Sequence, residues 1–69
     1  VYPSPADGFL IIDTKDQLVN VKILNLAGEC VKIIENGDQK IDISSLASGI
    51  FIVEVNGDNL RTVHKIIKI

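Results

Sequence analysis

Hydrophobic and polar residues alternate with a period of two along much of this chain, which is the pattern of β-strands that are half-buried in a sheet. The clearest stretch is residues 19–24, where Val19, Val21 and Ile23 share one face and the residues between them share the other. Nowhere does the spacing of an amphipathic helix, i, i+3, i+4, i+7, continue for three turns. The pattern predicts an all-β fold.

Turn-forming residues divide this pattern into six or seven short strands. Asn25-Leu26-Ala27-Gly28 predicts a type I turn with a bulge, and two Asn-Gly pairs, at 36–37 and 56–57, predict tight hairpin turns. Ser44 to Gly49 is too short for a real helix and predicts a crossing loop that contains at most one helical turn. Strands at this close spacing are typical of an antiparallel β-sandwich. We expect strands at 9–14, 19–24, 29–35, 41–43, 50–55 and 60–69.

The first eight residues differ from the rest, because Pro3 and Pro5 impose an extended, linker-like conformation. With 69 residues the chain forms a single domain, residues 1–69. It contains no methionine, so we expect it to be a piece excised from a longer precursor.

Charge and hydropathy exclude two classes of partner. The net charge of −2 and the pI near 5.1 leave no basic face for a phosphate backbone, so we expect no nucleic-acid binding. The longest apolar runs, Phe9–Ile12 and Ile50–Val53, are far shorter than the ~20 residues of a membrane-spanning helix. We therefore expect no direct insertion into a membrane.

No set of residues has the spacing of a catalytic or metal site. His64 is the only histidine and Cys30 the only cysteine, and nothing around Ser44 or Ser45 suggests a nucleophile. The aspartates lie near turns and form no calcium loop. We expect no enzyme activity, no metal and no cofactor, with His64 facing solvent on a strand and Cys30 a partly buried thiol.

The last predicted strand is a basic strip in an acidic domain, because no acidic residue follows Asp58. The strip contains Arg61, His64, Lys65 and Lys68. It can serve as a recognition surface, or its lysines can protect an edge strand from sticking to other strands. If Phe51, Val53 and Val55 face the core, then Ile50 and Ile52 point outward, and together with Ile66 they would form an exposed apolar patch.

Four separated segments resemble, in order, the motifs of one known family. Tyr2-Pro3-Ser4-Pro5 is similar to a Tyr-Pro-Asn-Pro box, and the turn that includes Gly28, with Glu29 and Val31 after it, is similar to an Asp-x-x-Gly-Lys-x-Val motif. The segment from Leu46 through Gly49 to Phe51 is similar to Leu-x-x-Gly-x-Tyr, and Lys65-Ile66-Ile67-Lys68 to a terminal Lys-hydrophobic-hydrophobic ending. These are the motifs of the C-terminal sorting domains, type A, of the bacterial type IX (Por) secretion system. The chain departs from them at four positions: Ser4, Asn25, Glu29 and Phe51.

The resemblance implies an immunoglobulin-like antiparallel sandwich that acts as an address label on a cargo protein. Its partners would be an outer-membrane translocon, shuttle proteins and a sortase-like cysteine peptidase that removes the label, while the cargo passes from the periplasm to the surface or medium. The residues implied for recognition are Gly49, Phe51, Lys65, Ile66, Ile67 and Lys68, with Pro3, Pro5, Gly28 and Leu46 as further motif positions. We expect docking by a strand edge or an exposed face rather than by a pocket.

Two other functions remain open from the sequence. A carbohydrate-binding or adhesive sandwich would stack exposed aromatic rings on sugars, but the chain has only three aromatic residues, Tyr2, Phe9 and Phe51, and we expect two of them to be buried. An inert spacer would tolerate residues added after Ile69, whereas a terminal signal would not.

Overall fold

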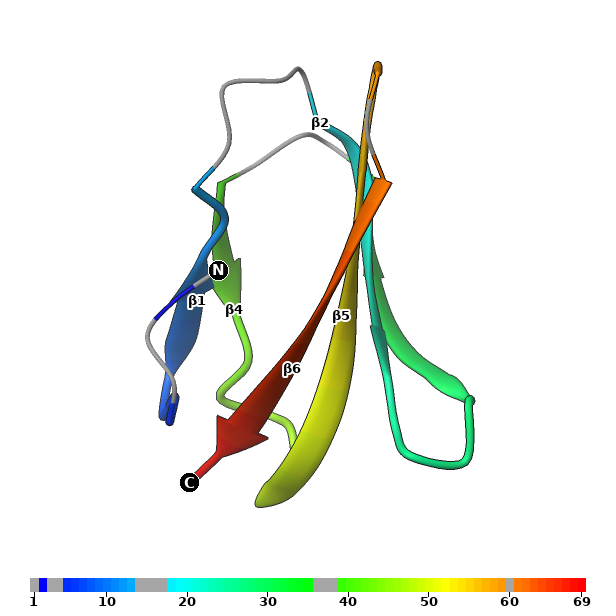
Figure 1. The fold of residues 1–69 in the computed structure, drawn as a ribbon. Coiled ribbons are helices and arrows are strands. Elements are labelled where there is room, and N and C mark those ends of the chain that lie inside the picture. Colours follow the sequence, from blue (N-terminus) through cyan, green and yellow to red (C-terminus); the bar gives the residue numbers. More distant parts are fainter. Residues whose placement is uncertain (1, 3–4, 14–17, 36–38, 60) are drawn as a thin grey trace.

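Six β-strands form the fold in the computed structural model, which describes residues 2, 5–13, 18–35, 39–59 and 61–69. Their order along the chain is shown in Figure 1. The strands are β1 (Phe9–Ile11), β2 (Leu18–Leu24), β3 (Cys30–Ile34), β4 (Lys40–Asp42), β5 (Gly49–Gly57) and β6 (Arg61–Lys68). The described residues contain no helix; the crossing loop has only a hydrogen-bonded turn, in which Leu46 N donates to Ile43 O over 3.0 Å.

The strands make two layers, which stand side by side in Figure 1. One is a four-stranded sheet in the order β3-β2-β5-β6, and the other is the pair β1-β4. Every strand pair is antiparallel. The expected all-β sandwich is confirmed, and the arrangement is consistent with an immunoglobulin-like one.

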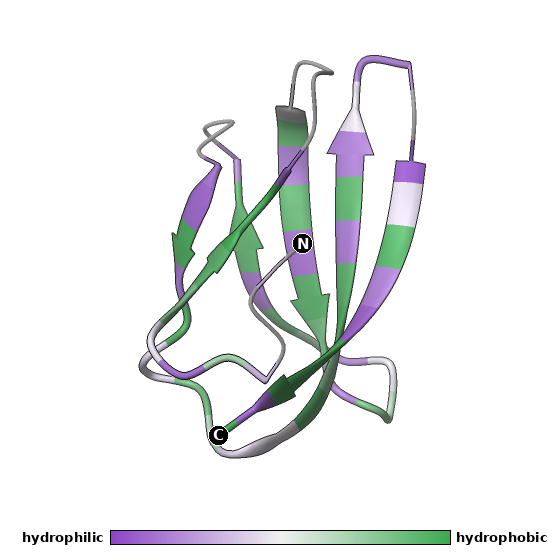
Figure 2. Ribbon diagram, turned by 60° about the vertical axis from the view of Figure 1, so that its left-hand side comes forward, coloured by the Kyte–Doolittle hydropathy of each residue, from purple (hydrophilic) through white to green (hydrophobic). Residues whose placement is uncertain are grey.

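Alternate residues of the strands supply the core between the two layers. On β2 and β5 the buried positions follow the predicted period of two, which Figure 2 shows as bands of contrasting hydropathy along these strands. Val19 breaks the pattern at 49% exposure, because the pairing of β2 with β5 shifts between Leu18 and Asn20. The buried core consists of Ala6, Leu10, Ile12, Val21, Ile23, Ile41, Ile43, Phe51, Val53, Val55 and Ile66.

The predicted turn between β2 and β3 is confirmed in detail. Gly28 has a φ of 86°, which a residue with a Cβ rarely adopts. Its N–H donates to Asn25 O, while the Asn25 side-chain oxygen accepts hydrogen bonds from the backbone N–H groups of Ala27 and Glu29, each over 3.0 Å. The expected bulge appears as a register shift between Ile23 and Leu24.

One predicted turn begins later than expected, and the other lies outside the described residues. Asn56 and Gly57 belong to β5 itself, and Asn56 pairs with Arg61. The connection to β6 therefore spans residues 58–60. Asn56 stays in the strand because its side-chain amide bridges Asn20 and Glu54 on the sheet face. The Asn-Gly pair at 36–37 is not among the described residues.

Residues near the start of the chain connect the two layers. Tyr2 pairs with Ile11 of β1, and Ala6 forms a parallel bridge with Lys68 of β6. Ala6 N donates to Ile67 O over 2.7 Å, and Ile69 N donates to Ala6 O over 2.8 Å. We call this pairing of Ala6 and Asp7 with residues 67–69 the terminal clasp.

Candidate partner-binding surface

Successive residues of the β5–β6 hairpin point to opposite sides of the large sheet. Ile50 lies opposite Ile67, Ile52 opposite Lys65, and Glu54 opposite Val63. Three of these hydrophobic side chains are well exposed, at 40% for Ile50, 56% for Val63 and 47% for Ile67. These three, with Ile52, form an apolar patch on the solvent side of the sheet, which we call the outer patch: Ile50, Ile52, Val63 and Ile67.

The outer patch contains Ile67 and not Ile66, which corrects the expectation from the sequence. Ile66 lies opposite Phe51, and at 1% exposure it belongs to the core. Two consecutive isoleucines on a strand must point to opposite faces. The hairpin register decides which of them points inward.

The basic strip expected along the last strand is divided between the two faces of the sheet. Arg61 and Lys65 are on the solvent side and are exposed, whereas Lys68 is only 7% exposed. The Lys68 amine donates to Ile69 O over 2.8 Å and lies 3.9 Å from the Asp7 carboxylate. Lys68 thus takes part in the terminal clasp.

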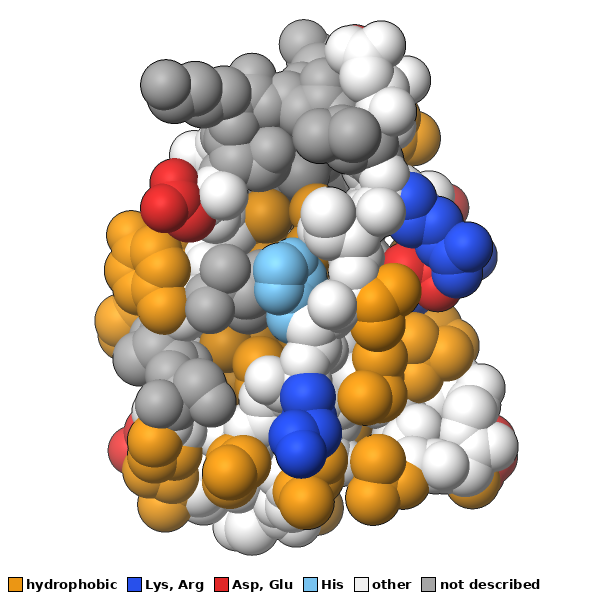
Figure 3. All heavy atoms as spheres, viewed as in Figure 1, with side chains coloured by type: hydrophobic (Ala, Val, Ile, Leu, Met, Phe, Trp, Pro, Cys, Tyr) orange, Lys and Arg blue, Asp and Glu red, His pale blue; other side chains and the backbone are white. Residues whose placement is uncertain are grey.

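Lys65 is the cation that remains available beside the outer patch. Within the described residues its amine has no hydrogen bond and no ion pair. Its strand neighbours on the same face are Val63 and Ile67. In the view of Figure 3, hydrophobic side chains (orange) gather over the lower half of the molecule, where basic side chains (blue) are sparse.

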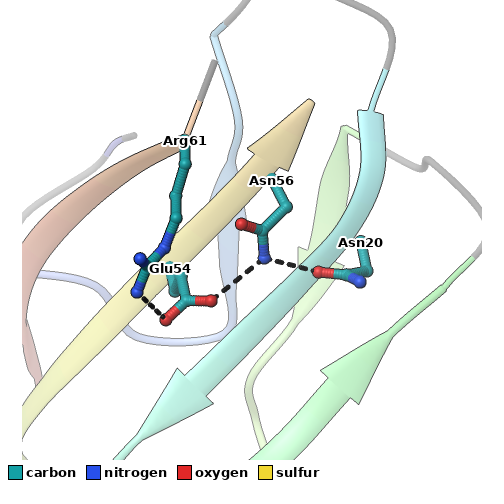
Figure 4. A network of polar contacts seen from close by, with 4 residues as sticks. All are labelled: Asn20, Glu54, Asn56 and Arg61. Atoms are coloured by element: carbon teal, nitrogen blue, oxygen red, sulfur yellow. Dashed lines mark hydrogen bonds and ion pairs between the residues drawn. The ribbon is translucent and has the colours of Figure 1, made fainter. Parts of the chain in front are cut away.

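A polar network occupies the other end of the same sheet face (Figure 4). Arg61 donates to Glu54 over 3.0 Å, and the Asn56 amide donates to Glu54 over 3.1 Å and to the Asn20 side-chain oxygen over 2.6 Å. The hydrogen bonds from Asn56 and then from Arg61 lower the pKa of the Glu54 carboxyl. Arg61 is therefore already paired, and the outer face is divided into a polar end and an apolar end.

The other motif residues build the fold around this surface. Phe51 is buried, Leu46 packs against the core, and Gly28 and Gly49 hold positive φ values of 86° and 150°. Pro5 is exposed, and Pro3 lies outside the described residues. Of the positions implied for recognition, only Lys65, Ile67 and Gly49 are exposed.

His64 and Cys30 have different surroundings from those expected. His64 lies opposite Val53 on the inner side of β6 and is half-buried, with Nε2 3.0 Å from the Thr62 hydroxyl, and this burial lowers the pKa of the imidazole. Cys30 is exposed at the start of β3 rather than partly buried. Across the parts of the chain that the structure describes, no three His, Cys, Asp or Glu side chains come together as metal ligands.

A shallow depression of about 460 Å³ lies over the small sheet. It is lined by Gly8, Phe9, Lys40, Asp42 and Ser44. Phe9 is 42% exposed and Tyr2 51%, so two aromatic residues are accessible where only one was expected. The Lys40 amine sits 4.9 Å above the Phe9 ring, which takes up a face that a sugar would need.

The hydrogen bonds from Ser44 lower the pKa of the Asp42 carboxyl, since they favour its charged form.

The comparison with known families decides between a sorting signal and the alternatives. The sequence profile of the secretion system C-terminal sorting domain matches residues 1–69. The chain belongs to this family. A sorting domain of this family is a signal for type IX secretion, so the expected function as a C-terminal secretion signal is confirmed, and a carbohydrate-binding role is not favoured.

A curated relative agrees with this assignment. The sorting domain is 41% identical over 63 residues to Beta-agarase D of Zobellia galactanivorans. The match covers 91% of this chain and 13% of the agarase, so the chain spans only a small part of that protein. No solved structure gives a significant match. Among the described residues, no helix is long and apolar enough to cross a membrane.

Proposed function

We propose that this sorting domain carries an attached cargo protein from the periplasm through the outer-membrane translocon, and that the outer patch with Lys65 is the surface that the machinery reads. One observation supports this surface above all. The terminal motif Lys65-Ile66-Ile67-Lys68 alternates between exposed and buried residues, and its exposed half, Lys65 and Ile67, adjoins the exposed Ile50 of β5.

The partners of this surface are proteins. They are the translocon, the shuttle proteins and a sortase-like cysteine peptidase that removes the domain, and the cargo precedes the domain in the same precursor. The cargo then remains at the cell surface or is released. The domain itself acts by binding and uses no catalytic residue, metal or cofactor.

The buried motif residues act as positioning residues in this proposal. Phe51 and Ile66 fix the register of β6, and Lys68 fixes the end of the strand through the terminal clasp. Changing them should alter export only as far as it alters folding. Changing Lys65 or Ile67 should alter export at unchanged stability.

A fusion experiment tests the function directly. The chain is joined to the carboxyl end of a periplasm-targeted fluorescent reporter in a bacterium with a working type IX system. We expect the reporter at the cell surface or in the medium, and we expect it to stay in the periplasm when the translocon gene is deleted. Retention in the periplasm of the intact strain would contradict the proposal.

Substitutions in the same fusion test the surface. Lys65→Ala and Ile67→Ser should reduce export several-fold while the melting temperature of the domain stays near that of the wild type. Val31→Ser is a matched control, because Val31 is a strand residue of similar exposure, 43%, outside the outer patch. Equal export of all three variants would exclude the outer patch as the recognised surface.

A further inference from the structure

Along its outer edge, β6 carries backbone groups to which no described residue forms a hydrogen bond. In an antiparallel strand the backbone N–H and C=O groups of successive residues point to opposite sides, so those of residues two apart point to the same side. The backbone groups of Ile67 and Ile69 point away from β5, because they form the hydrogen bonds to Ala6 in the terminal clasp. The backbone groups of Val63 and Lys65 therefore point to the same side as those of Ile67 and Ile69. No other described residue makes a backbone hydrogen bond to them there.

This edge has neither a proline nor a bulge, two of the features that block pairing with another strand. The opposite edge of the sheet, β3, is interrupted by a bulge. The pairing of β6 with β5 has no register shift along its eight residue pairs, so no bulge interrupts β6. Among the described residues, the clasp pairs only with the last residues of β6, and none pairs with the edge from Arg61 to Lys65.

The side chains on this edge indicate what would bind to it. Val63 is 56% exposed, and two residues further along the same face is the unpaired cation of Lys65. In a strand pair, aliphatic side chains favour aliphatic partners directly opposite, and a lysine favours a carboxylate. The complementary strand carries an aliphatic residue opposite Val63 and an acidic residue opposite Lys65.

A second copy of the chain fits this edge poorly. Antiparallel self-pairing centred on Val63 would place Arg61 of each copy opposite Lys65 of the other. Like charges that face each other across a strand pair are destabilising. A centre closer to the end of β6 would collide with Ala6, which already occupies the edge there.

We infer that the outer edge of β6 receives an extended segment of a secretion-system protein, which carries an aliphatic and an acidic side chain two residues apart on one face, as an added fifth strand of the large sheet. This inference rests on the proposed function, since it names how a partner engages the same surface. Main-chain hydrogen bonds supply the contact, and Lys65 selects the partner by its charge.

Amide exchange with a defined probe tests the edge. The probe is a synthetic nine-residue peptide with threonine at every even position, glutamate at the central position and valine at the other odd positions. In the control peptide, lysine replaces the glutamate. We expect exchange at the N–H groups of Val63 and Lys65 to slow by about tenfold or more when the first peptide binds. Thr62 and His64, which point towards β5, should change little. No slowing, slowing on β3 instead, or equal slowing by both peptides would overturn the inference.

Reversing the charge of residue 65 gives a second, independent test of the inference. Lys65→Glu should weaken binding of the glutamate peptide by about tenfold and should favour the lysine peptide, because an attractive cross-strand pair becomes a repulsive one. An unchanged preference between the two peptides would contradict the role of Lys65. Elution of the free chain at twice its mass would instead show that a second copy occupies the edge.

A backbone substitution in the reporter fusion links the edge to export. Val63→Pro removes one outward N–H and no bond to β5, so it should preserve the sheet and reduce export more strongly than Val63→Thr, which changes the same side chain but keeps the N–H. If the wild-type fusion is not exported, the proposed function fails. If the wild type and a folded Val63→Pro are exported equally, the edge inference alone fails. Should Val63→Pro not fold, the exchange experiment decides.

Discussion

Gly49 holds the backbone in a conformation that other residues rarely adopt, at the point where the crossing loop enters β5. Its φ is 150°, and it lies opposite Lys68 of the terminal motif. A Cβ at this position would have no atom within 4 Å, so the requirement for glycine comes from the backbone and not from lack of space. The glycine of the Leu-x-x-Gly motif therefore has a conformational role.

Replacement of Gly49 by alanine should lower the free energy of unfolding by about 1–3 kcal/mol, the usual cost of a strained backbone conformation. Gly8→Ala is the matched control, because Gly8 has an equally open site and no positive φ. The control should be neutral or slightly stabilising. Urea unfolding measures both variants, and equal stabilities would contradict a conformational role for Gly49.

Glu54 should make stability depend on pH. Its pKa is lowered in the folded chain by Asn56 and Arg61, so the unfolded chain, with a carboxyl pKa of about 4.3, binds its proton first as the pH falls. The stabilisation is complete above that pH and is lost as the pH falls through the lower folded value. The melting temperature of the wild type should therefore approach that of Glu54→Gln below about pH 4. A difference between the two that stays constant from pH 7 to pH 3 would exclude this contribution.

At the scale of the element, β6 performs two tasks with alternate residues. Its inner side completes the core through Ile66 and closes the terminal clasp through Lys68. Its outer side exposes Val63, Lys65 and Ile67, which belong to the surface that we propose for recognition. A strand can separate these tasks because successive side chains point to opposite faces.

Adjacent alanine substitutions in β6 should separate stability from export. Ile66→Ala leaves a cavity in the core and should cost about 2–5 kcal/mol. Ile67→Ala removes a side chain that is 47% exposed and should cost less than about 1 kcal/mol, while export of the reporter falls. Thermal melting and export of the same fusion measure the two effects, and a larger loss of stability in Ile67→Ala would show that the register is wrong.

Strand positions and most of the core could be predicted from the sequence, because Val21, Ile23 and Val53 follow a clear period of two. The choice between Ile66 and Ile67 could not, since both are isoleucine and the decision depends on a turn that starts after Gly57. The burial of Lys68 could not be predicted from the sequence either. Its amine is satisfied by Asp7 and by the carbonyl of Ile69, and the contact with Asp7 joins two distant parts of the chain.

At the scale of the whole molecule, the fold closes by joining its first described residues to its last. Ala6 is fully buried in the core and bonds to residues on both sides of Lys68. The large sheet is thus tied to the segment that leads into β1. Stability of the end of β6 should depend on residues more than 60 positions earlier in the chain.

Truncation measures this dependence. A chain that begins at Pro5 keeps Ala6, whereas a chain that begins at Gly8 loses both backbone hydrogen bonds of the clasp. The second should be less stable than the first by about 2 kcal/mol, from two hydrogen bonds at roughly 1 kcal/mol each. Exchange at Ile69 N–H should also become fast in the shorter chain. Equal melting temperatures would show that the clasp adds nothing to stability.

The parallel bridge between Ala6 and β6 also determines how the domain would respond to mechanical tension. If its amino end is pulled by an attached protein and its carboxyl end is held, the two bonds at Ala6 lie side by side across the line of force and must break together. Such a shear geometry resists load better than one in which bonds open one after another. Under such a pull, force would pass from Ala6 directly into the last strand through these two hydrogen bonds.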